Sequence, residues 1–255
     1  MSAMALSKSK QAESDYYAKL GEGGLEHSAR KPYSDDNCAQ YHANLAALFG
    51  VIEPPPQRIV DFGCGTGWLS LCLAQRGYQV MGVDISRDAI LCAQKEAAKR
   101  GLDNARFVTA DYEDFSEDGI SSDYAVFHDA LHHAESETQA LSCAYRTLRI
   151  GGAAIVIEPG RGHHLAESSK RAVETFGVHE REMHPSRVVA AAKRSGFRRH
   201  LVLPFPFHHN RFIYRRTYKG TMSSGELRRR CLLGALRVIR QFLPNRREGM
   251  VVLWK

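Results

Sequence analysis

The sequence predicts an α/β fold in which helices cover both faces of a doubly wound, mostly parallel sheet. Three observations predict it. From Arg58 onward, short apolar runs alternate with helical patterns, which is typical of parallel strands joined by helices. The first run ends in a turn with three glycines at alternate positions, VDFGCGTG at residues 60–67. The second run ends at Asp84, 21 positions after Gly63, where such sheets place a ligand-binding carboxylate.

The expected elements follow one another in order along the chain. The strands, each a short apolar run, are residues 58–63, 78–86, 105–112, 123–130, 153–159, 197–205 and 249–255. The helices, each with a helical pattern, are residues 35–50, 68–77, 87–101, 135–149, 166–177 and 185–196. Ser86 is placed to cap a helix, while Gly77, Gly101 and the pair Gly151-Gly152 end helices. Three prolines, residues 54–56, separate the first helix from the first strand.

The composition is that of one globular domain. The chain has 255 residues, 44% hydrophobic and 25% charged, which is enough to bury a substantial core and argues against disorder. Its six cysteines form no Cys-x-x-Cys pair and predict thiols in a reducing compartment rather than a disulfide framework. Neither the start nor any later stretch has the apolar length of a signal peptide or a membrane span. We therefore expect a cytoplasmic protein.

Four motifs, VDFGCGTG, GVDIS, ADYEDF and the LRIGG turn before AAIVIEP, resemble those of the class I S-adenosylmethionine-dependent methyltransferases. The third glycine comes one residue earlier than in the G-x-G-x-x-G motif of dinucleotide enzymes. The resemblance covers roughly residues 17–205, and the final run GMVVLWK also fits. It implies a seven-stranded sheet whose last strand is antiparallel, S-adenosyl-L-methionine as the cofactor, and methyl transfer as the activity.

The resemblance also implies which residues hold the cofactor. The three glycines would line its methionine and ribose parts, where the bulk of a Cβ would push the ligand out. Asp84 would hold the ribose hydroxyls and Asp111 the adenine amino group. The complete set implied to contact the cofactor is Asp61, Gly63, Cys64, Gly65, Gly67, Asp84, Ile85, Asp111, Tyr112 and His128.

A base for the methyl acceptor has to come from other residues. Methyl transfer from a sulfonium is an in-line displacement, and an acceptor hydroxyl additionally needs its proton removed near the methyl group. The candidate bases, which follow the fourth and fifth strands, are His132, His133 and His163. Our first hypothesis is that His133 accepts the proton. Glu158 either contacts the acceptor or anchors a backbone turn.

Four segments are expected along the chain. Residues 1–57 form an N-terminal segment, which in this family often covers the active site, and residues 58–206 form the cofactor-binding core. Residues 207–248 are a basic insertion, and residues 249–255 complete the core as its last strand. The N-terminal side chains that would face the acceptor are Tyr17, His27 and Tyr33.

Two absences shape the expected chemistry. Methyltransferases that act on exocyclic adenine or glutamine amides resemble one another in an N/D-P-P-Y step, where this chain has His-Asp-Ala-Leu at residues 128–131. This argues against methylation of DNA adenine. The histidines and cysteines are scattered, and within a helix the adjacent pairs His132-His133 and His163-His164 would point to different sides. We therefore expect no metal.

The net charge of +7 is concentrated in the basic insertion. Residues 207–248 hold eleven Lys or Arg and two acids, a sum of +9, so the rest of the chain carries −2. Within the insertion, residues 226–243 predict a basic amphipathic helix. Three interpretations stay open: packing on its own domain, peripheral contact with a membrane surface or a lipid-linked substrate, and, as the weakest, nucleic-acid binding.

The expected function is S-adenosylmethionine-dependent methyl transfer to a hydroxyl of a small or lipid-linked acceptor, with sugars among the candidates. The alternatives are N- or C-methylation of a small metabolite, and a regulatory protein that binds the cofactor without turnover. Nucleic acid is not an expected partner, and the sequence predicts no oligomeric state.

Overall fold

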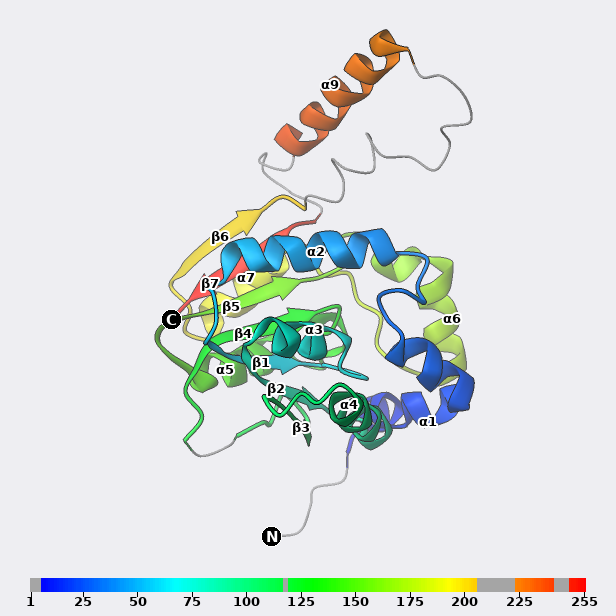
Figure 1. Ribbon diagram of the computed structural model, residues 1–255, viewed down its shortest axis with the longest axis vertical. Coiled ribbons are helices and arrows are strands. Elements are labelled where there is room, and N and C mark those ends of the chain that lie inside the picture. The colour runs from blue at the N-terminus through cyan, green and yellow to red at the C-terminus, as the bar shows by residue number, and fades with distance from the viewer. Residues whose placement is uncertain (1–5, 117–118, 206–222, 241–247) are drawn as a thin grey trace.

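A computed structural model describes residues 6–116, 119–205, 223–240 and 248–255. Within these residues, a seven-stranded sheet has the strand order β3-β2-β1-β4-β5-β7-β6 (Figure 1). The strands are β1 Arg58–Phe62, β2 Gln79–Asp84, β3 Ala105–Thr109, β4 Ser122–His128, β5 Leu148–Ile157, β6 Arg199–Leu203 and β7 Met250–Trp254. Strand β7 runs antiparallel to both β5 and β6, while the other pairs are parallel. The predicted sheet, with its antiparallel last strand, is confirmed.

Helices cover both faces of the sheet. One face packs against α2 (Cys38–Val51), α3 (Trp68–Arg76) and α4 (Arg87–Lys99). The opposite face packs against α5 (Glu137–Thr147) and α7 (Pro185–Arg194). Strand order reverses between β1 and β4, and such a reversal opens a crevice at the carboxyl ends of the strands.

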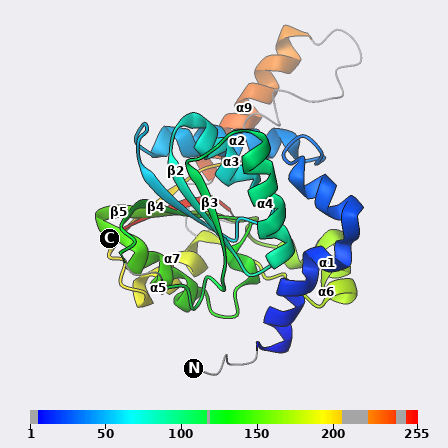
Figure 2. The same cartoon turned by 60° about the horizontal axis from the view of Figure 1, so that its bottom comes forward.

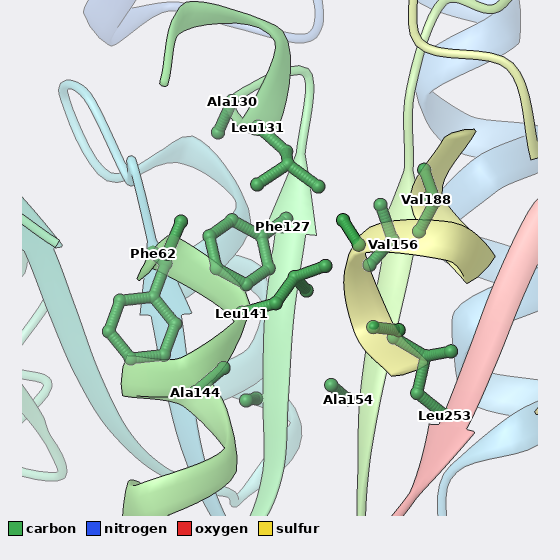
Figure 3. Close-up of a cluster of buried hydrophobic side chains, with 14 of the residues drawn as sticks. Phe62, Phe127, Ala130, Leu131, Leu141, Ala144, Ala154, Val156, Val188 and Leu253 are labelled. Carbon is green, nitrogen blue, oxygen red and sulfur yellow. The ribbon is translucent and has the colours of Figure 1, made fainter. Parts of the chain in front are cut away.

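The core under α5 and α7 fixes the two central strands beside that crevice. Figure 3 shows the rings of Phe62 from β1 and Phe127 from β4 next to Leu141 of α5, with Val188 of α7 further along the same face. The two rings stack with centroids 5.1 Å apart and planes 16° apart. Both rings are fully buried, and truncating a buried aromatic ring costs about 3–5 kcal/mol. The residues that follow β1 and β4 are therefore held on a rigid base.

The boundary between α5 and β5 differs from the sequence prediction. The helix was expected to continue to Arg149 and to end at the glycine pair, whereas α5 ends at Thr147 and β5 begins at Leu148. Leu148 is buried and pairs with Ser122. A Cβ at Gly152 would lie 2.8 Å from the carbonyl oxygen of Asp123 on β4. Gly152 thus serves the close approach of two strands rather than a helix end.

The N-terminal segment is helical over much of its length. Helix α1 (Lys8–Ala29) is capped by the Ser7 side chain, which accepts a hydrogen bond from the Lys10 amide. It is broken at Gly21, where φ is 68° and ψ is −175°. Both Figure 1 and Figure 2 show α1 beside α6 (Glu167–Phe176), at the edge of the sheet where the crevice opens. The sequence predicted a covering segment here but not this helix.

Helix α9 (Ser224–Arg240) extends away from the body of the molecule in both views (Figure 1, Figure 2). The predicted helix over residues 226–243 is confirmed as far as Arg240, and residues 241–243 lie outside the described residues. The apolar side chains Leu232, Leu236 and Ile239 are 62%, 49% and 58% exposed. Among the described residues, no helix combines the length and apolar character needed to cross a membrane.

Candidate active site

A cavity of about 570 Å³ lies at the carboxyl ends of β1, β2 and β4, under helix α1. This volume is within the range of about 300–1,000 Å³ that ligand sites occupy. Residues of the implied cofactor set that line it are Gly63, Gly65, Asp84, Ile85, Asp111 and Tyr112. All three candidate bases, His132, His133 and His163, line it as well. One cavity therefore joins the glycine turn to the histidines.

The glycine turn has a backbone that favours glycine, with φ of 71° at Gly63 and 52° at Gly65. A Cβ on Gly65 would lie 2.5 Å from the Tyr17 hydroxyl, and one on Gly63 would lie 2.5 Å from the Ala130 Cβ. Gly67 does not line the cavity. A Cβ at this position would lie 2.9 Å from the Ala93 Cβ of α4. Gly67 therefore serves helix packing, while the expected contact of Gly63 and Gly65 with the cofactor stays a prediction.

Asp84 is oriented by two backbone amides. Its Oδ2 accepts a hydrogen bond from the Gly65 amide at 2.8 Å, and its Oδ1 accepts one from the Ser86 amide at 2.8 Å. Burial raises the pKa of this carboxyl, although the two hydrogen bonds oppose the shift. Each oxygen keeps further acceptor capacity. The carboxylate fits the ribose hydroxyls that the resemblance assigns to it.

Asp111, which also lines the cavity, is paired with a lysine from α1. The Lys10 ammonium contacts Asp111 Oδ2 and lies 3.5 Å from Glu113 Oε1. Burial alone would lower the pKa of Lys10, but the hydrogen bond and charge of Asp111 outweigh it and raise that pKa. Sequence reasoning missed Lys10, because no local pattern relates it to a carboxylate on the far side of the fold.

Three other residues of the implied cofactor set lie behind the cavity wall. Asp61 accepts a hydrogen bond from the Ser70 hydroxyl at 2.6 Å, and burial raises its pKa to about 7. Cys64 packs in the core between α3 and α4, where burial raises the pKa of its thiol well above the usual value. His128 is buried, with its Nε2 3.2 Å from the Asn44 side-chain amide. Their proposed contact with the cofactor stays a prediction.

The histidines gather with a carboxylate at one wall of the cavity. We call His132, His133, His163 and Glu180 the histidine cluster. The His132 ring centroid lies 4.0 Å from that of His133 and 4.9 Å from that of His163. Glu180 Oε2 lies 2.6 Å from His163 Nε2 and 3.8 Å from His132 Nε2. The adjacent rings of His132 and His133 do not diverge as expected, since they lie in a 3₁₀ turn, Leu131–His133.

Glu158 organises this wall from behind and does not line the cavity. Its Oε1 accepts hydrogen bonds from the amides of Ala130 and Leu131, at 3.1 and 2.8 Å. Its Oε2 lies 2.6 Å from His132 Nδ1. Of the two roles left open by the sequence, the geometry fits the anchor of a backbone turn. It also fixes the orientation of the His132 ring.

The protonation of the two adjacent histidines differs. Burial is the main cause that lowers the pKa of His132 well below its usual value. Burial also opposes protonation of His133, but contact with Glu13 of α1 and other carboxylates outweighs it and raises the pKa to about 9. A base must be unprotonated before it acts. This ordering does not favour the hypothesis that His133 is the proton acceptor.

Of the three N-terminal side chains expected near the acceptor, one lies in the cavity. Tyr17 lines it, with its hydroxyl over Gly65. His27 is exposed and Tyr33 is 79% exposed, and neither lines the cavity. Instead, α1 contributes Glu13 and Lys10, and α2 contributes Tyr41.

Comparisons with known proteins agree with this architecture. Residues 59–152 match the family model described as a methyltransferase domain. Over 121 residues the chain is 34% identical to the S-adenosyl-L-methionine-dependent Diels-Alderase iccD of Talaromyces variabilis, covering 46% of this chain and 41% of that protein. Over 58 residues it is 43% identical to the ribosomal RNA small subunit methyltransferase C of Alcanivorax borkumensis, covering 23% of this chain and 18% of that protein. The chain thus spans less than half the length of these curated relatives.

A solved structure resembles the whole chain. Phosphoethanolamine N-methyltransferase 2 of Haemonchus contortus, in complex with S-adenosyl-L-methionine, has a TM-score of 0.64 and 19% sequence identity. The match covers 98% of this chain and 59% of the other. Since one relative is named for ribosomal RNA, the expectation that nucleic acid is not a partner finds no support among the relatives.

Proposed function

We propose that this chain is a class I S-adenosylmethionine-dependent methyltransferase that methylates an acceptor held beside the histidine cluster. One observation supports this most directly. The glycine turn and Asp84 lie in the same cavity as His132, His133 and His163. When bound, S-adenosyl-L-methionine supplies a methyl group activated by the positive charge on its sulfur. The chain has to align the acceptor with that group and keep water away.

We assign the cofactor to the end of the cavity that the glycine turn lines. In this assignment Asp84 binds the ribose hydroxyls, and Asp111, with Tyr112 beside it, binds the adenine. The oriented carboxylate of Asp84 supports the first contact, since a bond to a charged acceptor is worth about 1.5–3 kcal/mol. A sulfonium is a cation, and the nearby acidic side chains favour it electrostatically.

The charge of the cavity restricts the acceptor. Among the described residues, the acidic side chains that line the cavity are Glu13, Asp84, Asp111, Glu113, Asp129, Glu180 and Glu248. The Lys and Arg side chains that line it are Lys10 and Lys31, and Lys10 is already paired. Such a lining repels an acceptor that presents phosphate or carboxylate near the reaction centre. We therefore propose a neutral polar acceptor, with a hydroxyl of a small or lipid-linked molecule as its reacting group.

A hydroxyl acceptor must lose its proton, and we propose that it does so at the histidine cluster. His132 is the most firmly oriented member, because Glu158 holds its Nδ1 and leaves Nε2 directed toward Glu180. The ring centroids of His133 and His163 lie 4.0 and 4.9 Å from that of His132. The cluster therefore surrounds one point of the cavity wall with three imidazoles and a carboxylate.

Transfer of labelled methyl groups tests this proposal. The protein is incubated with methyl-labelled cofactor and fractionated extract, and label is followed into lipid, soluble metabolite, protein and RNA. We expect label in neutral metabolite or lipid, and an effect of His132→Ala on turnover of about 10²-fold or more with cofactor affinity retained. His164→Ala is the matched control, since His164 follows His163 in the chain but does not line the cavity. Label in RNA or in an anionic metabolite would contradict the acceptor assignment.

A second candidate is cofactor binding without methyl transfer. It is supported by similarity to a relative that is named a Diels-Alderase rather than a methyltransferase. Calorimetric titration showing tight cofactor binding, together with no label transfer to any fraction, would favour this candidate. Label on a nitrogen or carbon of a small metabolite would instead favour the N- or C-methylation that the sequence left open.

For helix α9, we propose peripheral contact with an anionic membrane surface. Its exposed apolar side chains are Leu227, Leu232, Leu233, Leu236 and Ile239. The exposed arginines Arg228, Arg229 and Arg240 lie on the same helix, and basic amphipathic helices bind anionic headgroups. Sedimentation with phosphatidylglycerol vesicles should carry the protein down, and the double variant L232E/L236E should stay in solution. Vesicles of phosphatidylcholine alone are the control. Equal recovery with both vesicle types would remove the anionic membrane surface as the partner.

A further inference from the structure

We propose that His132, His133 and Glu180 form a binding site for a divalent transition-metal ion. Each residue offers one ligand atom, and these atoms all lie within 4.8 Å of one another. Two imidazoles and a carboxylate are a donor set that suits Zn²⁺ and neighbouring first-row ions. This inference goes beyond the expectation of no metal, which rested on the spacing of the histidines along the chain.

The two histidines are oriented as metal-binding histidines commonly are. His132 Nδ1 lies 2.6 Å from Glu158 Oε2, and His133 Nδ1 lies 2.6 Å from the carbonyl oxygen of His179. In both contacts the nitrogen donates its hydrogen to an oxygen, so Nε2 is the atom left to bind an ion, which at His133 would displace a proton. A histidine that binds metal usually donates its other ring N–H to a carboxylate or backbone carbonyl. Both rings satisfy that requirement at once.

Glu180 supplies the third ligand. Its Oε2 is buried and lies 2.6 Å from His163 Nε2 and 3.8 Å from His132 Nε2. Burial would raise the pKa of Glu180, but contact with His163 and the charges of the neighbouring histidines lower it. A buried carboxylate that faces several imidazoles can hold a cation together with them. His163 lies next to it as a candidate fourth ligand.

The surroundings favour a dication and leave access to it. Around the two histidines lie the carboxylates of Glu13, Glu158 and Glu180, and Asp129 adds a further negative charge nearby. Because the three ligand residues line the cavity, an ion there would keep a coordination position open toward the acceptor. A bound ion would make loss of the acceptor proton easier. That consequence rests on the proposed function, whereas binding of the ion does not.

Metal titration of the full chain tests the site. After treatment with EDTA and dialysis, the protein is titrated with Zn²⁺ in a calorimeter and with Co²⁺ in a visible-range spectrometer. We expect one equivalent to bind, with a Co²⁺ spectrum free of the thiolate charge-transfer band that cysteine ligands would give. Variants His132→Ala, His133→Ala and Glu180→Gln should each weaken binding at least tenfold. Glu158→Gln, which disturbs the orientation of His132 and the turn at Ala130 and Leu131 without removing a ligand, should weaken it about 10- to 100-fold.

His164→Ala is again the control and should bind like the parent. Circular dichroism checks that each variant is folded. The unaltered protein gives a test that needs no variant: its thermal unfolding midpoint should rise when Zn²⁺ is added. No stoichiometric binding of either ion, or binding that the three ligand variants leave unchanged, would overturn the site. Methyl transfer that persists with chelator and without bound metal would also overturn a role in the reaction. It would leave the proposed function intact. Metal binding without any label transfer would support the metal site and contradict the proposed methyl transfer.

Discussion

The ammonium group of Lys10 on α1 forms an ion pair with the carboxylate of Asp111, 101 positions further along the chain. Both side chains are about 15% exposed or less. The pair ties the N-terminal helix to the end of the cavity that we assign to the adenine. It also places a cation in the cavity that we propose for a sulfonium cofactor.

The first prediction follows from this pair. Lys10→Met frees Asp111 to accept a hydrogen bond from the adenine amino group and removes a like charge from the cavity. We expect cofactor affinity to rise by about two- to fivefold, equivalent to about 0.4–1 kcal/mol. Calorimetric titration measures it. Lys8→Met, an exposed lysine on the same helix, is the control. Weaker binding by Lys10→Met would mean that the pair is needed to hold α1 over the cofactor.

The second prediction tests Asp84 as the ribose ligand. Asp84→Asn keeps a carbonyl oxygen but loses the charge, so cofactor affinity should fall about 10- to 100-fold. The sharper comparison uses a cofactor analogue without ribose hydroxyls. The parent should bind this analogue more weakly than the natural cofactor, and Asp84→Asn should bind both about equally. An unchanged preference in the variant would assign the hydroxyls to another group. Asp103→Asn, on the surface, is the control.

The third prediction concerns the pH dependence of stability. Asp61 is buried with a pKa of about 7, raised from 3.8, so the folded state binds a proton that the unfolded state has already lost. Asp61 therefore contributes favourably to the free energy of unfolding in acid, and this contribution is lost as the pH rises from about 4 to 7. Between pH 5 and 8 the loss amounts to about 2–3 kcal/mol.

Urea denaturation of Asp61→Asn checks this. Because the variant does not titrate at this position, its free energy of unfolding relative to the parent should rise by that amount from pH 5 to pH 8. The exposed variant Asp103→Asn should show no such change. If the difference between Asp61→Asn and the parent were the same at both pH values, the Asp61 carboxyl would be ionised throughout.

The fourth prediction separates backbone strain from packing at the glycine turn. Gly67 and Gly101 both have positive φ, 84° and 63°. A Cβ at Gly101 meets nothing within 4 Å, whereas one at Gly67 meets the Ala93 Cβ at 2.9 Å. Gly101→Ala should cost about 1–2 kcal/mol of stability from strain. Gly67→Ala should cost a further 1–3 kcal/mol from overpacking. Thermal or urea unfolding measures the stability of both variants. If Gly67→Ala and Gly101→Ala lost equal stability, the packing role of Gly67 would be ruled out.

The sheet, the glycine turn and Asp84 could be predicted because each is encoded locally. Alternating apolar runs specify the strands, and the distance from Gly63 to Asp84 is that of one turn, one helix and the strand that follows. The sequence also predicted the helix that became α9, since its apolar and basic residues repeat with the helical period. Local patterns could not relate Lys10 to Asp111, or Asn44 to His128, because those contacts join distant segments.

The histidine cluster shows a different limit. The prediction assumed that His132 and His133 would sit in a helix and diverge, but a single 3₁₀ turn brings the rings together. Glu180 comes from the segment between α6 and α7, which carries no periodic signal. The four members of the cluster therefore meet through loop conformations that the sequence alone does not specify.

Strands β6 and β7 are neighbours, and Leu203 pairs with Met250. The two ends of the basic insertion are thus brought together by main-chain hydrogen bonds of the sheet, whatever lies between them. Chain length added at such a point strains neither strand, and the entropy cost grows only slowly with length. The basic insertion can consequently vary in length and sequence without altering the pairing of the two strands that flank it.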